Sequence, residues 1–158
     1  MTTGLTPTPE TDALAKFPWS LTYTITLAGH QITTDLLVKN TSTDKPFAFQ
    51  ALLHTYFAAP ASSVAIGPLT GLTYIDKVGG GVERKETREL VDVRTYTDAV
   101  YKDASGHYSV RWSGGGADIK TIGFKDVVVW NPNKDAGSKI GDMNEGGWCV
   151  SDCFRVST

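Results

Sequence analysis

The fold class of this chain is indicated most clearly by residues 46–57, which read Pro46-Phe47-Ala48-Phe49-Gln50-Ala51-Leu52-Leu53-His54-Thr55-Tyr56-Phe57. Successive side chains of a β-strand point to opposite faces, so residues two apart share a face. On this basis one face carries Phe47, Phe49, Ala51, Leu53 and Phe57, and the other carries Gln50, Leu52, His54 and Tyr56. The pattern predicts a strand with an apolar face in the core and a more polar face, bearing a histidine, outside it.

Composition favours an all-β protein and excludes several classes of function. The 158 residues are rich in Thr, Val, Tyr and Gly, and helical periodicity is hard to find. A formal net charge of −2 provides no basic surface for nucleic acid. No apolar run is long enough for a membrane span, and the first residues lack the basic-then-apolar pattern of a secretion signal. We therefore expect a cytoplasmic protein that binds neither nucleic acid nor membrane.

Alternation predicts further antiparallel strands on both sides of this stretch. Residues 1–16 contain Thr-Pro pairs and predict a linker or extended lead-in. Residues 20–27 and 32–39 alternate around a short turn and predict a hairpin. The other expected elements are short strands at 64–66, 72–75 and 127–130, a strand over 90–97 that ends at Asp98, a hairpin over 101–112 and a solvated loop or edge over 83–89. Together they predict an antiparallel β-sandwich of roughly eight to ten strands.

Metal and nucleophile chemistry find little support in the sequence. Cys149 and Cys153 form a Cys-x3-Cys pair, whose spacing leaves both a metal site and a disulfide open. The three histidines are scattered, and the Gly-x-Ser-x-Gly pattern of a nucleophile elbow is absent. We expect neither a metal nor a cofactor. Proton transfer needs fewer residues than either of these sites, because a single histidine with an ordinary pKa of about 6.5 exchanges a proton near neutral pH.

Two interpretations of His54 remain open from the strand alone. The residue is either an ordinary hydrogen-bonded histidine on a sheet face or a proton donor and acceptor for a polar ligand. Gln50 and Tyr56 on the same face make the second interpretation chemically reasonable.

Four ordered segments resemble the glucose-6-phosphate 1-epimerases, which are hexose-6-phosphate mutarotases of the aldose 1-epimerase superfamily. These segments are Phe49-Gln50-Ala51-Leu52-Leu53-His54-Thr55-Tyr56-Phe57, Gly71-Leu72-Thr73-Tyr74-Ile75-Asp76-Lys77, Thr97-Asp98-Ala99-Val100-Tyr101 and Val127-Val128-Val129-Trp130-Asn131-Pro132. The resemblance implies a galactose mutarotase-like β-sandwich that interconverts the α and β anomers of hexose 6-phosphates by acid/base ring opening. It further implies that residues 17–148 correspond to the C-terminal half of that domain.

The resemblance also implies roles for two side chains. His54 would be the general acid that protonates the sugar ring oxygen, and Asp98 would bind sugar hydroxyls. From the residues alone, Asp98 can equally be a strand-end residue that bonds its own turn. Trp130 and Asn131 either shape the wall of the cleft or are plain core and turn residues.

The sequence departs from the family pattern at both ends. Family members are longer, and their N-terminal half carries arginines expected to bind the substrate phosphate. Their general base is a glutamate in a Cys-x-Glu-Pro segment, and no such segment is found here, although Asp142 still matches an intervening aspartate. Residues 149–158 read as a non-family tail, typical of a shifted reading frame or a misplaced splice. Asp152 is the nearest carboxylate to the missing base, and we expect the tail to have little that holds it in register.

Two hypotheses follow from these observations. The chain is either an incomplete hexose-6-phosphate epimerase, inactive alone and monomeric when full length, or a non-catalytic β-sandwich fragment that binds sugar. A small sugar phosphate is the expected partner in the first case. We expect His54 and Asp98 on neighbouring strands with side chains within about 10 Å, because both must reach one sugar ring. We also expect exposed apolar surface and unpaired strand edges, because half of the family fold is absent.

Overall fold

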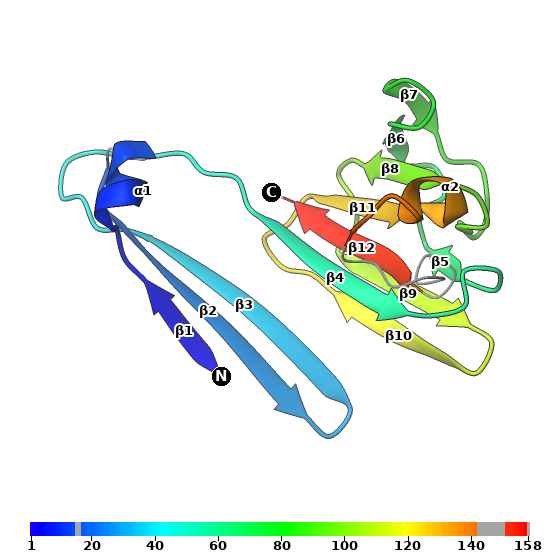
Figure 1. The fold of residues 1–158 in the computed structure, drawn as a ribbon, viewed down its shortest axis with the longest axis horizontal. Helices are drawn as coiled ribbons and strands as arrows, with labels where there is room; N and C mark the ends of the chain where they lie inside the picture. Colours follow the sequence, from blue (N-terminus) through cyan, green and yellow to red (C-terminus); the bar gives the residue numbers. More distant parts are fainter. Residues whose placement is uncertain (15–16, 142–150, 158) are drawn as a thin grey trace. The chain divides into compact units, whose positions relative to one another are not determined.

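A computed structural model describes residues 1–14, 17–141 and 151–157, and divides the chain into two compact units, Met1–Phe49 and Gln50–Thr158. The described residues form twelve β-strands in three sheets and two short helices (Figure 1). Every pairing between these strands is antiparallel. The all-β prediction is confirmed, with more strands than the eight to ten expected because several short ones carry no clear alternation.

The first unit is a three-stranded sheet in the order β1-β2-β3. Its elements are β1 (Thr2–Leu5), α1 (Pro9–Leu14), β2 (Trp19–Ala28) and β3 (Gln31–Asn40). The predicted hairpin is confirmed, because Leu21 pairs with Val38 and Leu27 pairs with Ile32. The first 16 residues, expected as a linker or lead-in, include β1, which pairs with β2, and the short helix α1.

The strand expected over residues 46–57 is shorter than predicted and begins only at Leu52, as β4 (Leu52–Ala58). Pro46 has no N–H group to give to a strand ladder. Phe47 instead stacks on Phe17 with ring centroids 4.7 Å apart, and Phe49 lies 6.0 Å from Phe47. The expectation that Phe47, Phe49 and Ala51 continue the core face of this strand is therefore wrong, since they precede it.

The second unit contains a six-stranded sheet in the order β4-β12-β11-β8-β6-β7 and a three-stranded sheet in the order β10-β9-β5. Their strands are β5 (Ala65–Gly67), β6 (Thr73–Asp76), β7 (Val82–Lys85), β8 (Thr97–Tyr101), β9 (His107–Trp112), β10 (Gly115–Lys120), β11 (Asp126–Asn131) and β12 (Ser151–Ser157). Helix α2 (Asn133–Gly137) follows β11.

The core of the second unit lies between these two sheets. Ile66 on β5 and Val110 on β9 share one cluster with Tyr101 on β8 and with Val127 and Val129 on β11. Leu53 and Phe57 of β4 pack against that cluster from the edge of the larger sheet. The predicted sandwich is thus confirmed, and β4 shows the predicted alternation over the residues where it is a strand.

Two predicted elements differ in the structure because alternation does not say which strand is the partner. Residues 90–96 form no strand, although Val91 and Val93 are fully buried, and Asp98 lies at the start of β8 rather than at the end of a strand. Residues 101–112 are not a hairpin, because β8 and β9 belong to different sheets. Strand β9 pairs with β10 instead, around Gly114, whose φ of 90° suits glycine.

The tail expected to lack a fixed register contributes a strand to the middle of the larger sheet. Residues 151–157 form β12, which pairs with β4 on one side and with β11 on the other (Figure 1). The expectation of no register is wrong for these residues. Cys153 lies in β12, whereas Cys149 and Asp142 lie outside the described residues, and the proposed domain boundary at residue 148 stays a prediction.

Candidate functional site

His54 lies in the middle of β4, with its side chain exposed. The flanking residues Leu53 and Phe57 pack against the core, so His54 is on the opposite face of the sheet. Tyr56 shares this outer face, is 57% exposed, and has its ring centroid 6.4 Å from that of His54. A rigid strand therefore presents an accessible imidazole beside a phenol.

The strand register extends this face across the sheet to Asp98. Tyr56 on β4 pairs with Cys153 on β12, which pairs with Trp130 on β11, which pairs with Asp98 on β8. Residues directly opposite one another in a sheet share a face. The rings of Tyr56 and Trp130 meet edge to face with centroids 6.4 Å apart. His54, Tyr56, Trp130 and Asp98 thus lie on one sheet face, and we call these four residues the candidate site.

Asp98 carries an unusual carboxylate oxygen. Its Oδ1 is buried and accepts no hydrogen bond from the described part of the chain. A buried polar atom without a partner is unfavourable by roughly 1–3 kcal/mol, so native structures usually supply one. A water molecule or a ligand hydroxyl would satisfy this oxygen.

The expected proximity of His54 and Asp98 is only partly right. They share a face, but β12 and β11 lie between their strands, so the expectation of neighbouring strands is wrong. Three strand spacings of about 4.8 Å separate the two backbones by about 14 Å across the sheet. Tyr56 and Trp130 occupy the space between them. The sequence analysis placed Tyr56 on the same face as His54, and the structure agrees, but it did not foresee the contact between Tyr56 and Trp130.

Asp152 on β12 and Asp126 on β11 are the carboxylate residues nearest to His54 in the strand register. Asp152 pairs with Phe57, a core-facing position, so its register position has the opposite parity to that of His54. Asp126 has the same parity as Trp130 on β11, and its Oδ1 accepts a 3.2 Å hydrogen bond from the Asp103 amide. The sequence analysis did not single out Asp126, because it precedes the apolar run that marked this strand.

Trp130 and Asn131 are consecutive residues of β11, but their side chains make different contacts. Trp130 lies on the face of the candidate site, against Tyr56. Asn131 is fully buried, and its Oδ1 accepts a 2.7 Å hydrogen bond from the Asn133 amide at the end of the strand. Asn131 therefore acts as a turn residue, which was one of the two interpretations left open for it.

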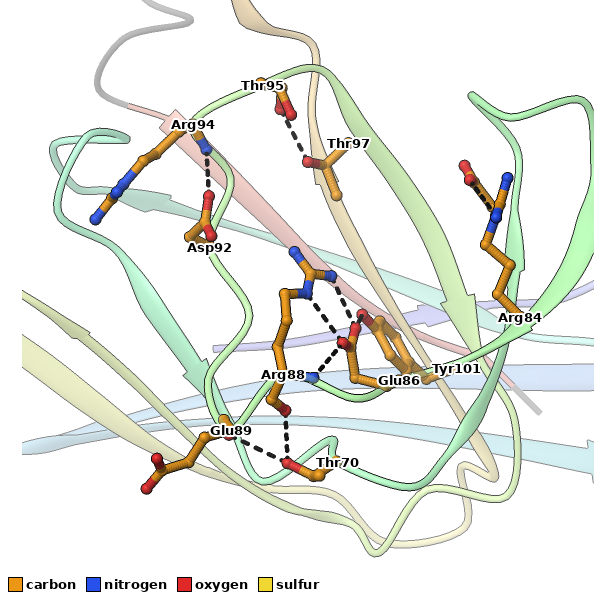
Figure 2. Close-up of polar contacts among 11 residues, drawn as sticks. Thr70, Arg84, Glu86, Arg88, Glu89, Asp92, Arg94, Thr95, Thr97 and Tyr101 are labelled. Atoms are coloured by element: carbon orange, nitrogen blue, oxygen red, sulfur yellow. Dashed lines mark hydrogen bonds and ion pairs between the residues drawn. The ribbon is translucent and has the colours of Figure 1, made fainter.

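A second polar cluster lies apart from the candidate site, around Glu86 (Figure 2). The Glu86 side chain is almost completely buried, accepts hydrogen bonds of 2.9 and 2.8 Å from the Arg88 guanidinium and accepts one of 2.7 Å from the Tyr101 hydroxyl. Burial alone would raise the pKa of Glu86, but the bonds from Arg88 and Tyr101 outweigh it and lower the pKa to about 2. Burial and the contact with Glu86 raise the pKa of Tyr101.

The cluster corrects the expectation that residues 83–89 are solvated throughout. Strand β7 is a charged edge as predicted, but Glu86 directly after it belongs to the interior. Tyr101 pairs with Val127, a core position, so this cluster reaches the core rather than the face of the candidate site. Its contacts are satisfied within the protein, and its role is to hold the segment after β7 against the core.

Over residues 1–14, 17–141 and 151–157, no group of three or more His, Cys, Asp or Glu side chains is arranged to hold a metal ion. In the same part of the chain, no helix has the length and apolar character needed to cross a membrane.

Comparison with known proteins identifies the family. A model of the aldose 1-epimerase family matches residues 2–153, which is nearly the whole chain. The chain belongs to the aldose 1-epimerase family. The match includes all four residues of the candidate site.

Two crystal structures share the fold of this aldose 1-epimerase family member. A "putative mutarotase (YeaD)" from Salmonella typhimurium matches with a TM-score of 0.88 and 22% identity, over 99% of this chain and 52% of that protein. The protein HI1317 matches with a TM-score of 0.66 and 16% identity, over 89% of this chain and 48% of that protein. The chain thus spans about half the length of the solved structures that it matches.

Proposed function

We propose that this aldose 1-epimerase family member acts on hexose 6-phosphates and interconverts their α and β anomers. The observation that carries the proposal is the candidate site, where an accessible histidine shares one sheet face with a carboxylate whose buried oxygen accepts no hydrogen bond from the described residues. The four segments that resemble glucose-6-phosphate 1-epimerases support the choice of sugar phosphate. The family match supports anomer interconversion in general.

The proposed reaction is acid/base opening and closing of the sugar ring. A base removes the proton of the anomeric hydroxyl, the C1–O5 bond breaks as C1 becomes a carbonyl carbon, and an acid protonates the ring oxygen. Rotation about C1–C2 and closure on the other face invert C1. His54 is the proposed acid, because it is held by a strand and its side chain is accessible.

Asp98 is the proposed sugar-binding carboxylate. A sugar hydroxyl that donates to its buried Oδ1 would supply the missing hydrogen bond. Between Asp98 and His54, Tyr56 and Trp130 present aromatic surface, on which the apolar C–H face of a sugar ring can pack. The backbone span of about 14 Å leaves room for one ring and the two side chains that reach it.

Residues 1–158 by themselves should not measurably accelerate anomerisation. They contain no Cys-x-Glu-Pro segment to supply the base, and one positioned acid or base contributes roughly a hundred- to ten-thousand-fold. Asp152 is a poor substitute because its register position has the opposite parity to that of His54. Asp126 shares the face but is bonded to the Asp103 amide.

The test is a coupled assay with a dehydrogenase specific for the β anomer. It compares this chain with a longer version that carries the arginine-bearing half and a Cys-x-Glu-Pro segment, each with and without His54→Ala. We expect activity only in the longer version, and its loss in the His54→Ala variant. If the longer version anomerises free hexoses but not hexose 6-phosphates, the proposed substrate is wrong. If the short chain matches the longer one, the account of the missing base is wrong.

A second candidate function is sugar binding without catalysis. The wide separation of His54 and Asp98 favours it, because side chains that far apart can hold a sugar without acting on one bond. Titration of the chain with glucose 6-phosphate, followed by NMR shifts of Tyr56 and Trp130, would detect such binding. Shifts that disappear in Asp98→Asn, together with no rate in the coupled assay of the longer version, would favour this function over the first.

A further inference from the structure

The face of the candidate site continues past Asp98 to one more strand. Strand β8 lies between β11 and β6 in the larger sheet (Figure 1). Asp76 at the end of β6 pairs with Ala99. The Lys77 amide continues this ladder by donating a 2.9 Å hydrogen bond to the Asp98 carbonyl. Paired residues of an antiparallel ladder place their side chains on the same face, so Lys77 lies beside Asp98 on the face of the candidate site.

The backbone at Lys77 is held by the turn that follows β6. Asp76 Oδ1 accepts a 2.8 Å hydrogen bond from the Gly79 amide, and its Oδ2 accepts one of 2.9 Å from the Arg84 side chain. A Cβ atom at residue 79 would lie 2.4 Å from Asp76 Oδ2, so a side chain there would displace this carboxylate. The turn therefore fixes the place of Lys77, and it also occupies the carboxylate next to Lys77 in the sequence.

Lys77 and Asp98 each carry polar atoms that the described residues do not use. The Lys77 side chain is exposed, and its ammonium takes part in none of the ion pairs or side-chain hydrogen bonds among the described residues. Opposite it, the buried Oδ1 of Asp98 accepts no hydrogen bond from the same residues. A cationic donor and an anionic acceptor thus lie on adjacent strands of one face.

On the basis of the function proposed above, we propose that Lys77 binds the sugar together with Asp98. The hydroxyl that donates its proton to Asp98 Oδ1 accepts a hydrogen bond from the Lys77 ammonium through its oxygen. One hydroxyl can make both bonds, because it has one O–H donor and two acceptor lone pairs. The two bonds strengthen each other, since a hydroxyl that accepts from a cation is a better donor to a carboxylate.

The order of the strands indicates which part of the sugar Lys77 contacts. His54, the proposed acid at the ring oxygen, lies on β4, and Asp98 lies on β8, about 14 Å away across the sheet. Lys77 lies about 5 Å further in the same direction. In a pyranose ring C3 is opposite the ring oxygen, whereas C6 with its phosphate is attached beside the ring oxygen. Lys77 therefore contacts the hydroxyls around C3, which glucose and glucose 6-phosphate share.

The test compares Lys77→Met with the matched control Lys85→Met. Both variants remove an exposed ammonium and keep an unbranched apolar side chain. Lys85 lies on the same sheet face, because it pairs with Thr73, four residues before Lys77, and its ammonium also has no partner among the described residues. NMR titration of the full chain with glucose and with glucose 6-phosphate gives the two affinities, and circular dichroism checks that each variant is folded.

We expect Lys77→Met to weaken the binding of both sugars by about ten-fold, and Lys85→Met by less than about two-fold. Lys77→Arg keeps the charge and the donors and should retain most of the affinity. Equal effects of the two Met variants would overturn the proposal. A loss of affinity for glucose 6-phosphate alone would also overturn it, because Lys77 would then contact the phosphate. Absence of saturable binding of either sugar to the unmodified chain would overturn it as well.

The proposed function fails on a different measurement. If the longer version in the coupled assay does not anomerise hexose 6-phosphates, while Lys77→Met still weakens the binding of both sugars, the proposed reaction is wrong and the role of Lys77 stands. If the longer version is active and its KM is equal in Lys77→Met and Lys85→Met, the proposed reaction stands and the role of Lys77 is wrong.

Discussion

The two units of this chain are made from similar strands but have opposite degrees of burial. Strand β2 alternates as regularly as any strand in the chain, yet its apolar residues reach no more than partial burial. Strand β11 lies between β12 and β8 in the larger sheet and under the smaller one, and Val127 and Val129 are buried completely or almost so. Alternation thus identifies a strand and its apolar side, while burial depends on which other layer is present.

The largest expected effect comes from a charge placed in each unit. Val127→Asp puts an unpaired carboxylate into the core of the second unit and should lower its free energy of unfolding by more than about 4 kcal/mol. Leu27→Asp in the first unit should change it by less than about 0.5 kcal/mol, because Leu27 is 80% exposed. Urea denaturation measures both. Similar losses would show that Leu27 lies on a covered face of the first sheet.

The next effect comes from the buried carboxylate of the second unit. Glu86→Gln removes the charge that binds the Arg88 guanidinium and should lower the free energy of unfolding by about 2–3 kcal/mol. Tyr101→Phe removes the single bond from the hydroxyl and should cost about 1 kcal/mol. Chemical denaturation gives both values. A Glu86→Gln variant as stable as the unmodified chain would mean that burial of the charge cancels its hydrogen bonds.

The same carboxylate predicts an acid-sensitive step in stability. The pKa of Glu86 is lowered from 4.5 to about 2 in the folded chain, so as the pH falls the unfolded state takes up the proton first. The contribution of Glu86 is therefore complete above about pH 4.5 and is lost between about pH 4.5 and 2. It should amount to about 1–3 kcal/mol, since solvent screens the partly exposed Arg88. Denaturation curves at several pH values should show this slope in the unmodified chain and a flatter one in Glu86→Gln.

These carboxylates and strands show what the sequence could and could not predict. The hairpin of β2 and β3 and the apolar strand β11 were recognisable because their patterns are local. The order β4-β12-β11-β8 was not, because it depends on β12, which pairs with strands far from it in sequence. The sequence analysis expected His54 and Asp98 to line one cleft from neighbouring strands. It could not predict that β12 and β11 lie between their strands.

The burial of the Glu86 carboxylate could not be predicted from the sequence either. Residues 83–89 form a charged run, and such runs usually face solvent. Glu86 departs from this rule because Arg88 and Tyr101 satisfy it from two directions, and Tyr101 is 15 residues away. Phe47 and Phe49 show the reverse case, since they continue an apolar alternation but contact aromatic neighbours before the strand begins.

A smaller effect is expected at the aromatic part of the candidate site. Tyr56→Ala should weaken binding of glucose 6-phosphate about five- to ten-fold, because it removes an exposed ring on which a sugar can pack. Leu52→Ala is the matched control, since Leu52 is an exposed residue of β4 on the same face as Tyr56 but four residues away from it along the strand. NMR titration of each variant measures the affinity. Equal losses would indicate general loosening of β4 rather than contact with the sugar.

The smallest expected effect concerns Asp98. Its replacement by Asn and that of Glu86 by Gln should change the free energy of unfolding in opposite directions. Glu86 is buried with its hydrogen bonds made, whereas the buried Oδ1 of Asp98 accepts none from the described residues. Asp98→Asn removes the charge near this oxygen and should raise the free energy of unfolding by about 0.5–1 kcal/mol, while Glu86→Gln lowers it. The same Asp98→Asn change should weaken sugar binding, since a neutral amide oxygen accepts a hydroxyl proton less strongly than a carboxylate does. A stabilised variant with weaker binding is the combination expected of a residue retained for a ligand. If Asp98→Asn instead destabilises the chain and leaves sugar affinity unchanged, Asp98 is a structural residue, and the candidate site reduces to His54 and its aromatic neighbours.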